Sequence, residues 1–559
     1  MFANIQFKSY NTGIVSIFPI DLDAKIPEMS PVRLINSIVD GLNLDDVLGT
    51  YKGGGTTAYH PRPLLKVIFY AYMNNVYSCR RIAELLDRDF HYMWLSGGQT
   101  PSFSTINRFR SERLKDAVNS LFVQVVMKLV AAGQVSLDVQ YIDGTKIESA
   151  ANRYTFVWRK STERNKAKLE ARIRGILSQI EEGIAQDNLP AEETAALDSD
   201  TLRGIIDGIN EENSRRAEEG ASRQELRERR KAVGELQKAQ EKMREYEGRL
   251  EKLGGRNSYS KTDEDATFMH MKEDAMRNGQ TKPGYNVQIA TENQYITVFD
   301  LFPNPTDTLT LPPFLEHGRI LLGRLPRVVC ADSGYGSEQN YELMEQMGIE
   351  AYVKYNWFHK ELHRPFINDA FRQENLFYNE KDDYYVCPMG QHMTHSGSYR
   401  TTNPGGYQST IDKYTAANCE GCPLRCRCFD ATRGNRTIHV NHRLNRYKRK
   451  ARELLLSDEG MRHRSRRPIE PEAVFGQIKF DMLYRRFRHR GLDKVRMDFA
   501  LLAMSFNLRK LFKNAARTII ASPNPENMPQ NVPYLPPIRQ SLTPKLEKNN
   551  LYNVCSLAA

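Results

Sequence analysis

Apolar residues recur at helical spacing through the first part of the chain. Residues 61–73 begin with proline, which suits the first turn of a helix, and their apolar positions repeat every three or four residues, so we expect a buried helix there. Residues 78–87 combine an apolar stripe with charged positions, which predicts a second, amphipathic helix. The pattern indicates a helical domain over residues 1–130.

A glycine pair, Gly97 and Gly98, separates these helices from a third at residues 101–113. This third segment begins with Ser and Thr, which cap helix starts, and it carries Arg108 and Arg110. Two short helices, a glycine turn and a basic helix are typical of a helix-turn-helix DNA reader. An ordinary helical bundle with a solvated basic face gives the same pattern, and this segment alone does not choose between the two.

Strand patterns follow the helical segment. Alternation places Val139 and Asp143 on one face of a predicted strand, with Gly144 directly after the acid. Farther along, the apolar run Val328–Ala331 predicts a buried strand that delivers Asp332 to its end. Taken alone, Asp143 is explained as well by a turn as by chemistry, whereas for Asp332 a turn is the commoner explanation.

The remaining elements complete an α/β order. Two strands joined by a short turn predict a hairpin, apolar helices precede and follow the Asp332 strand, and a last strand comes after them. Once a charged helical insert is removed, that order describes a compact α/β domain with both aspartates at strand ends. The expected elements are residues 282–291 and 295–302 for the hairpin, 308–322 and 338–347 for the helices, and 349–354 for the last strand.

Two long segments interrupt the predicted sheet domain. Residues 159–253 carry mixed charges at three- and four-residue spacing, which predicts two long exposed helices joined by residues 187–201. Such a hairpin can bind DNA or a second subunit, but a solvated charged hairpin is the more economical interpretation. Residues 356–459 are basic and cysteine-bearing. Beyond residue 521 the chain is rich in Pro and Asn, which predicts a loose tail.

Composition narrows the class of protein. A chain of 559 residues suffices for several domains, and 40% hydrophobic with 26% charged residues is typical of a soluble globular protein. The sequence has no apolar run of membrane-spanning length and no signal-peptide pattern at its start, so the cytoplasm is the default expectation. The net charge of +11 favours an anionic partner.

Five of the eight cysteines fall between residues 387 and 428, which favours metal binding over a disulfide scaffold. Two cysteines separated by two residues suit tetrahedral zinc coordination. A small basic segment has little hydrophobic core, so a bound metal ion would help to stabilise its fold. Plain reduced thiols are the competing interpretation. The expected ligands are Cys387, Cys419, Cys422 and Cys428, with Cys426 as an alternate and His392 and His395 as further candidates.

A third acidic residue begins the helix predicted over residues 468–483. Pro471 fits the first helical turn, which makes Glu472 a helical residue, and Lys479 lies seven residues later on the same face. Glu472 could instead only favour the helix N-terminus, with Lys479 solvated. Residues 492–512 close the fold as an amphipathic helix. The arginines that flank this region are Arg464, Arg466, Arg467, Arg485, Arg486, Arg488 and Arg490.

A shared site explains the three acidic residues better than a separate structural role for each one does. These residues are Asp143, Asp332 and Glu472. Three carboxylates can hold two divalent cations about 4 Å apart, one activating the attacking oxygen and one stabilising the leaving oxygen of a phosphodiester. Hard oxygen ligands favour magnesium or manganese. Nearby Lys and Arg would neutralise phosphates. Metal-dependent chemistry on a nucleic acid is the interpretation that uses all three acids.

The motifs around these acids resemble those of DDE transposases of bacterial insertion sequences, most closely the group called insertion sequence eleven-eighty-two. One departure concerns Pro468, which stands where many relatives carry an arginine; Arg466 or Arg467 would substitute. The likeness extends to about residue 515. The matching stretches are Asp143-Gly-Thr-Lys, Ala331-Asp-Ser-Gly-Tyr-Gly-Ser, Glu472-Ala-Val-Phe-Gly-Gln-Ile-Lys, Tyr484-Arg-Arg-Phe, Arg490-Gly-Leu-Asp-Lys-Val and Asn507-Leu-Arg-Lys.

The resemblance implies an α/β ribonuclease-H-like (integrase-like) catalytic core with a mixed sheet. It also implies an N-terminal helical domain, a helical-hairpin insert and a cysteine-bearing zinc-type insert. The implied boundaries are 1–130 for the helix-turn-helix-like DNA-binding domain, 131–158, 262–355 and 460–515 for the core, 159–261 for the charged helical insert, 356–459 for the cysteine-rich basic insert and 516–559 for the tail.

The resemblance implies a transposase that binds the terminal inverted repeats of its element, hydrolyses phosphodiesters there and transfers the 3′-hydroxyls to target DNA. Synapsis of two ends implies at least a homodimer, without a membrane partner, in the cytoplasm of a bacterium at its nucleoid. A retired transposase that binds DNA without catalysis is the rival; a helical assembly protein built on residues 160–253 leaves the acids unexplained. The implied site consists of Asp143, Asp332 and Glu472 for catalysis and Mg²⁺ (or Mn²⁺), and Lys479, Arg466, Arg467, Arg108 and Arg110 for DNA.

Overall fold

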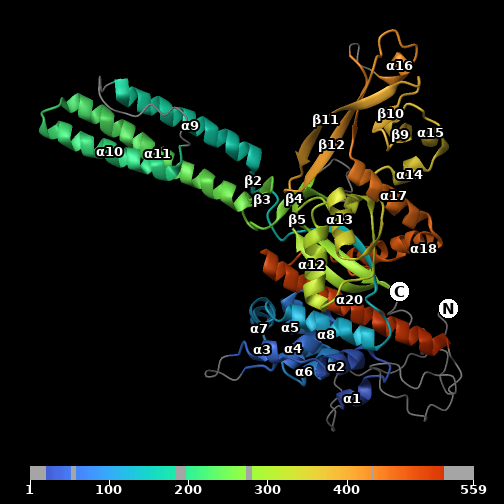
Figure 1. The fold of residues 1–559 in the computed structure, drawn as a ribbon. Coiled ribbons are helices and arrows are strands. Elements are labelled where there is room, and N and C mark those ends of the chain that lie inside the picture. Colours follow the sequence, from blue (N-terminus) through green and yellow to red (C-terminus); the bar gives the residue numbers. More distant parts are fainter. Residues whose placement is uncertain (1–20, 52–57, 183–196, 272–279, 430–433, 522–559) are drawn as a thin grey trace, which may run out of the picture. The chain divides into compact units, whose positions relative to one another are not determined.

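The computed structural model describes residues 21–51, 58–182, 197–271, 280–429 and 434–521 (Figure 1). The chain divides into two compact units, each assembled from separate stretches of sequence. We call them the helical unit (Met1–Ser136, Gly476–Tyr484 and Met497–Ala559) and the sheet unit (Leu137–Phe475 and Arg485–Arg496). The helical domain expected over residues 1–130 therefore also contains C-terminal segments that the sequence pattern assigns to the sheet domain.

The helical unit confirms the two N-terminal helices expected from the pattern, α4 (Pro61–Met73) and α5 (Cys79–Arg88). The pattern does not predict the short helix that follows, α6 (Phe90–Ser96), which ends where Gly97 and Gly98 adopt positive φ angles of 63° and 75°. The other elements of the unit are α1 (Leu22–Lys25), α2 (Pro31–Asp40), α3 (Asp45–Leu48), α7 (Phe103–Arg108) with a π-helical turn at Phe109–Arg113, α8 (Val118–Ala131), a second π-helical turn at Gln477–Asp481, and α20 (Leu492–Ala521) from Met497 onward.

A buried polar network joins the N-terminal helices of this unit to its C-terminal segments. Asp498 is fully buried on α20 and accepts hydrogen bonds from the hydroxyls of Tyr72 and Tyr484. Arg110 donates to the Tyr72 hydroxyl at 2.7 Å and to the Cys79 thiol at 2.9 Å. The expected DNA contact of Arg110 is therefore corrected: its side chain is 3% exposed and its guanidinium is bonded inside the helical unit.

A mixed sheet organises the sheet unit, as expected. The strand order is β6-β5-β1-β7-β8, and β4 also pairs with β5. β5 runs antiparallel to its three neighbours, whereas β7 runs parallel to β1 and β8. The predicted hairpin is β5 and β6. The strands are β1 (Val139–Glu148), β4 (Thr267–His270), β5 (Thr281–Glu292), β6 (Tyr295–Phe302), β7 (Val328–Ala331) and β8 (Glu350–Val353).

Three helices pack with this sheet around one apolar core. α12 (Leu311–Leu322) connects β6 to β7, α13 (Glu338–Gln346) connects β7 to β8, and α17 (His442–Leu456) lies against β8. The core contains all four residues of β7 and apolar residues of all three helices. Since α17 falls inside the segment 356–459 that we expected to be an insert, the cysteine-bearing insert ends before α17 and the sheet domain resumes there.

The first insert is a three-helix element on two short paired strands, β2 (Phe156–Trp158) and β3 (Ser258–Ser260) (Figure 1). The pattern predicts two helices, but the chain breaks at Gly220, where φ is 89°, and Ser222 caps a further helix. Buried aliphatic residues of all three helices form a separate small core. Residues 187–196 of the expected connection lie outside the described residues. The helices are α9 (Arg159–Glu182), α10 (Ser199–Glu218) and α11 (Arg223–Leu253).

The second insert is mainly β structure, which its cysteine pattern does not predict. Five antiparallel strands follow the order β13-β12-β11-β10-β9 over a core that includes Met393 and Tyr414. The strands are β9 (Phe377–Asn379), β10 (Tyr384–Val386), β11 (His392–Thr402), β12 (Gln408–Ala416) and β13 (Thr437–Val440). Short helices accompany them at α14 (Phe358–Glu361), α15 (Arg364–Ile367) and α16 (Arg425–Cys428).

His463, on α18 (Asp458–Arg466), makes the stability of the sheet unit sensitive to pH. Its ring is 9% exposed, and Nδ1 lies 2.9 Å from the Tyr141 hydroxyl. Burial lowers the pKa of His463 below its ordinary value, although Glu459 opposes that shift. His463 therefore binds a proton more readily in the unfolded chain than in the folded chain. The free energy of unfolding should consequently fall as pH drops below about 6.5.

The variant His463→Gln should remove part of that dependence, by up to about 1.4 kcal/mol per pH unit, because glutamine does not titrate. Urea unfolding between pH 7 and 5 measures the slope for both proteins. Equal slopes would contradict the assignment to His463.

Candidate active site

Asp143 and Asp332 lie close together because of strand register. The parallel pairing of β1 with β7 aligns Tyr141 with Cys330. Each aspartate is two residues beyond that pair, and parallel strands bring equivalent positions to one edge of a sheet. Asp143 is 8% exposed inside β1, which continues to Glu148, so it does not end its strand as we expected. The Asp332 side chain, just past β7, is 47% exposed.

A tight turn follows Asp332. Residues Ser333–Tyr335 form a 3₁₀ turn, and a Cβ atom at Gly336 would lie 2.8 Å from the Cα of Tyr355, so only glycine fits. Lys354 follows β8 as Asp332 follows β7, and burial lowers the pKa of Lys354 while Asp332 opposes the shift. Lys354 is not among the site residues expected from the sequence. The available signal was its place as the last residue of the strand predicted over residues 349–354.

Glu472 comes from a separate part of the sheet unit. A 3₁₀ turn at Arg467–Ile469 follows α18, and α19 (Pro471–Gly476) then begins with the proline in its first turn, as expected. Glu472 is therefore in the first turn of α19, and its side chain is 48% exposed.

One guanidinium contacts all three carboxylates. Arg467 Nη1 lies 2.6 Å from Glu472 Oε1, and Arg467 Nη2 lies 3.4 Å from Asp143 Oδ1 and 3.7 Å from Asp332 Oδ2. Arg467 is 7% exposed, so the guanidinium is shielded from bulk water, whereas the side chains of Asp332 and Glu472 are about half exposed. Three negative charges against one positive charge leave the group net negative, which favours the approach of further cations.

The same arrangement supplies the type of donor that divalent cations prefer. Carboxylate oxygens from three separate elements converge on one positively charged group, and such hard donors are those that Mg²⁺ and Mn²⁺ prefer. With Arg467 between the acids, the described residues form no group of three or more His, Cys, Asp or Glu side chains placed to hold a metal ion. Cation binding would therefore require the guanidinium to move.

The basic residues expected at DNA lie in different settings. Arg466, beside Arg467, and Arg108, at the end of α7, are both exposed. Lys479 is 4% exposed and lies in the helical unit, in the π-helical turn that follows α19. The regular α-helix expected over residues 468–483 therefore ends at Gly476. The seven-residue spacing therefore does not place Glu472 and Lys479 on one helix face, because a π-helical turn has a different hydrogen-bond spacing from an α-helix.

The cysteines of the second insert lie partly together. The backbone N–H of Arg436 donates to Cys419 Sγ at 3.4 Å, and its guanidinium donates to Cys428 Sγ at 3.0 Å. Cys387 and Cys419 pack half-buried against the core of the insert, Cys422 is half-buried and Cys426 is exposed. No three of these side chains form a metal-holding group in the part of the chain that the structure describes, so zinc stays a prediction.

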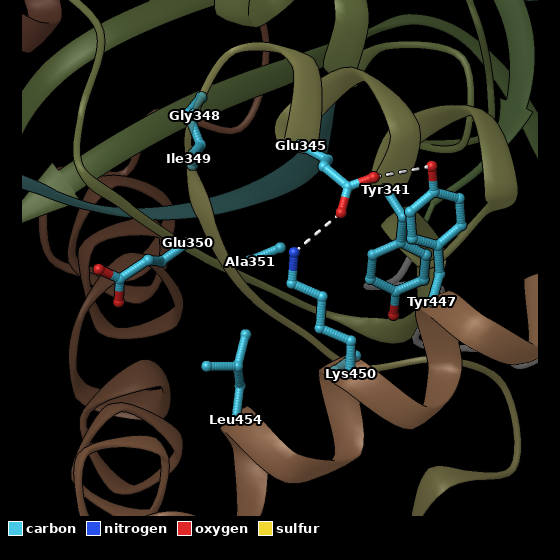
Figure 2. A pocket seen from close by; sticks show the side chains of 10 residues that line it. Tyr341, Glu345, Gly348, Ile349, Glu350, Ala351, Tyr447, Lys450 and Leu454 are labelled. Carbon is cyan, nitrogen blue, oxygen red and sulfur yellow. Dashed lines mark hydrogen bonds and ion pairs between the residues drawn. The ribbon is translucent and has the colours of Figure 1, made fainter.

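A pocket of about 280 Å³ lies elsewhere in the sheet unit, between α13, β8 and α17 (Figure 2). The ion pair between Glu345 and Lys450, at 2.9 Å, lies in it, and Tyr447 donates to Glu345 at 3.2 Å. None of the three carboxylates lines this pocket. The half-exposed Asp332 and Glu472 instead face solvent, which suits a large substrate better than an enclosed small molecule.

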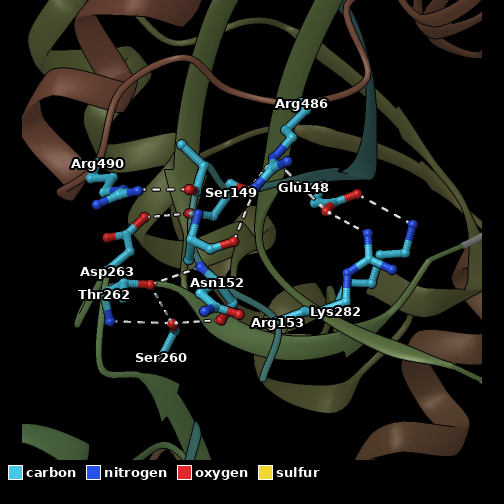
Figure 3. Close-up of polar contacts among 12 residues, drawn as sticks. Glu148, Ser149, Asn152, Arg153, Ser260, Thr262, Asp263, Lys282, Arg486 and Arg490 are labelled. Carbon is cyan, nitrogen blue, oxygen red and sulfur yellow. Dashed lines mark hydrogen bonds and ion pairs between the residues drawn. The ribbon is translucent and has the colours of Figure 1, made fainter. Parts of the chain in front are cut away.

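A basic cluster surrounds Glu148 at the last residue of β1 (Figure 3). Its carboxylate oxygens lie 3.2 Å from Lys282 Nζ, 3.7 Å from Arg153 Nη2 and 3.8 Å from Arg486 Nε. Arg486 also donates to two backbone carbonyls of the loop after β1, at 2.9 and 3.0 Å. Tyr154 extends from that loop and is 77% exposed. Three cations against one carboxylate leave this surface net positive.

Comparisons with known proteins agree with this picture. Residues 386–512 match the family model described as "Transposase DDE domain", and residues 20–112 match the one described as "Transposase domain (DUF772)". No curated protein matches the chain. The two matches support a transposase of the DDE type, and the first implies a ribonuclease-H-like fold, which agrees with the mixed sheet.

The first match includes Glu472 and Arg467 but neither aspartate. The tertiary contacts of Arg467 join Asp143 and Asp332 to them. Enzymes with this domain generally use Mg²⁺ or Mn²⁺. Within the described ranges, no helix combines the length and the hydropathy that crossing a bilayer requires.

Proposed function

We propose that this protein is a transposase of the insertion-sequence group that its motifs resemble. It binds the terminal inverted repeats of its own element, hydrolyses phosphodiesters at the element ends and joins the resulting 3′-hydroxyls to target DNA. The observation that carries the proposal is the convergence of Asp143, Asp332 and Glu472 on Arg467, in a chain with two transposase domain matches. Two element ends held together require at least a homodimer.

Asp143, Asp332 and Glu472 would hold Mg²⁺ or Mn²⁺. Divalent ions in such a site activate an attacking oxygen and stabilise a leaving oxygen of a phosphodiester. Asp143 supplies a buried, strand-fixed carboxylate, whereas the half-exposed Asp332 and Glu472 border the side from which DNA approaches. Arg467, displaced from the acids, and the neighbouring Arg466 would bind the phosphates beside the cleaved bond.

The remaining DNA contacts belong to two units. Arg108 on α7 of the helical unit is the exposed basic residue that fits recognition of the repeat. The motif resemblance also implies a DNA contact for Lys479, whose side chain is buried in this structure and would have to become exposed first. In the sheet unit, the basic cluster around Glu148 suits contact with DNA phosphates. Its three positively charged side chains outnumber the one carboxylate that holds them in place, so the cluster keeps a net positive charge. Structural zinc at the four predicted cysteines would brace the second insert.

Replacing Arg153, Lys282 and Arg486 together by glutamine should weaken binding of duplex DNA of any sequence. Each lost phosphate contact should reduce the slope of log affinity against log salt concentration by about 0.9. Fluorescence anisotropy at several salt concentrations measures the slope. Arg319→Gln is the matched control, since Arg319 is half-exposed and paired with Glu316 on α12. A triple variant with an unaltered slope would refute the assignment of this surface to DNA.

The experiment that tests the function is incubation of the full chain with a labelled duplex that carries the element's own end. In Mg²⁺ or Mn²⁺ the protein should nick the duplex at the end of the element, and EDTA should stop the reaction. Specific binding without any nicking in either metal would refute catalysis and support the rival function, a retired transposase that only binds DNA.

A further inference from the structure

A fourth carboxylate, Asp307, lies beside the segments that carry the catalytic aspartates. It belongs to the loop between β6 and α12 and is half-buried. Asp307 Oδ1 accepts a hydrogen bond from the side-chain amide of Asn286 at 2.7 Å and one from that of Gln288 at 2.8 Å. Both amides belong to β5 and are almost fully buried, at 1% and 0% exposure, so each needs an acceptor inside the protein.

This group supports the backbone next to Asp143. Gly144, the following residue, is paired with Gln288 across β1 and β5. A Cβ atom at position 144 would lie 2.7 Å from Asp307 Oδ1 and closer still to the Gln288 amide nitrogen. The ends of the Gln288 and Asp307 side chains therefore pack directly against the backbone of β1 at the residue after Asp143, in the space that glycine leaves open.

The same group is connected to the turn after Asp332. Tyr335, in that turn, donates from its hydroxyl to Gln288 Oε1. Next to Asp307, the Thr308 hydroxyl donates to the Gly334 carbonyl at 3.2 Å. Asp307 Oδ2 faces the same turn, since a Cβ atom at position 334 would lie 3.7 Å from it. Gln288 therefore contacts both aspartate-bearing segments. Its amide nitrogen donates to Asp307 Oδ1 at 2.8 Å and to Asn286 Oδ1 at 3.1 Å, so Asp307 orients Gln288 together with Asn286, which Asp307 also binds.

We propose that Asp307 is a positioning residue that sets the separation of Asp143 and Asp332 through Gln288. The inference rests on the proposed function, in which these two aspartates hold divalent cations. Asp307 itself acts as a fixed hydrogen-bond acceptor: with it in place, the Gln288 amide nitrogen faces Asp307 and its oxygen is left to accept from Tyr335. Without that acceptor, the Gln288 amide rotates or shifts, and the distance between Asp143 and Asp332 is no longer fixed.

Binding of Mn²⁺ to the full chain, followed by the electron paramagnetic resonance signal of free Mn²⁺, tests this without relying on activity. The double variant Asp143→Asn/Asp332→Asn supplies the baseline for ions bound elsewhere. Asp307→Ala should weaken Mn²⁺ binding about 10- to 100-fold, the usual range for residues that orient metal ligands. Asp307→Asn keeps an oxygen acceptor at the same place and should restore most of the affinity.

Tyr335→Phe removes only one hydroxyl and should also weaken Mn²⁺ binding. If circular dichroism shows that Asp307→Ala does not fold, the Mn²⁺ affinity of Tyr335→Phe tests the proposal in its place. Wild-type affinity in Tyr335→Phe and in a folded Asp307→Ala would overturn the proposal. Equal loss in Asp307→Asn and Asp307→Ala would also overturn it, because charge rather than position would then be the cause. Failure of the wild type to bind Mn²⁺ above the baseline would instead refute the metal chemistry of the proposed function, and this inference with it.

Discussion

Asp332→Ala should abolish nicking at the element end while binding of the same duplex is retained. Asp332 is one of three carboxylates around Arg467, and its side chain is 47% exposed to solvent. Losing one carboxylate from a metal-holding set removes about 4 kcal/mol of transition-state stabilisation, which corresponds to a rate loss of about a thousandfold. Binding should persist because the basic surfaces are unchanged.

The rate is measured on a duplex labelled at its 5′ end, and binding of the same duplex is measured by anisotropy. Asp138→Ala is the matched control, since Asp138 precedes β1 at its opposite end and has a comparably exposed side chain, paired with Arg324. The control should cleave at the wild-type rate. Nicking that survives in Asp332→Ala would mean that the active site lies elsewhere in the chain.

Arg467→Met should destabilise the protein in EDTA and make its stability depend on divalent cations. The substitution leaves three carboxylates to repel one another around the position of a guanidinium that is 7% exposed. Removing one partner of a buried ion pair costs about 3–5 kcal/mol. Since Asp332 and Glu472 are about half exposed, solvent screening reduces the expected loss to about 2 kcal/mol.

Mg²⁺ at millimolar concentration should restore most of that loss, because the cation takes over the charge of the guanidinium and binds only the folded chain. Urea unfolding with EDTA and with Mg²⁺ measures both effects. Arg466→Met is the control, because Arg466 is the exposed neighbour in the sequence and should change the free energy of unfolding little under either condition. An Arg467→Met protein that is equally unstable with and without Mg²⁺ would show that the acids do not form a cation site.

Local pattern predicted the elements well wherever a segment's own residues specify its structure. The helix at Pro61–Met73, the hairpin of β5 and β6, and the buried strand before Asp332 follow from proline position, alternation and an uninterrupted apolar run. The pattern failed where a short irregularity changed the element. Gly220 divides one expected helix into two, and the π-helical turn at Gln477–Asp481 ends the helix that was to carry both Glu472 and Lys479.

By itself, the sequence determined the types of chemical group and their order along the chain: two aspartates on strands, then a glutamate and a basic run before a terminal helix. Only the tertiary structure decided which arginine meets the acids. Arg466 and Arg467 are adjacent and identical in type, and the turn after α18 directs one to solvent and the other between three carboxylates.

The same holds for Asp307, which no motif distinguishes and which meets Gln288 of β5 from the loop that follows β6. Register and packing bring together residues far apart in the chain, and no local pattern encodes their distance. The sequence therefore specified the candidate chemistry, and the fold determined which side chains converge on one place.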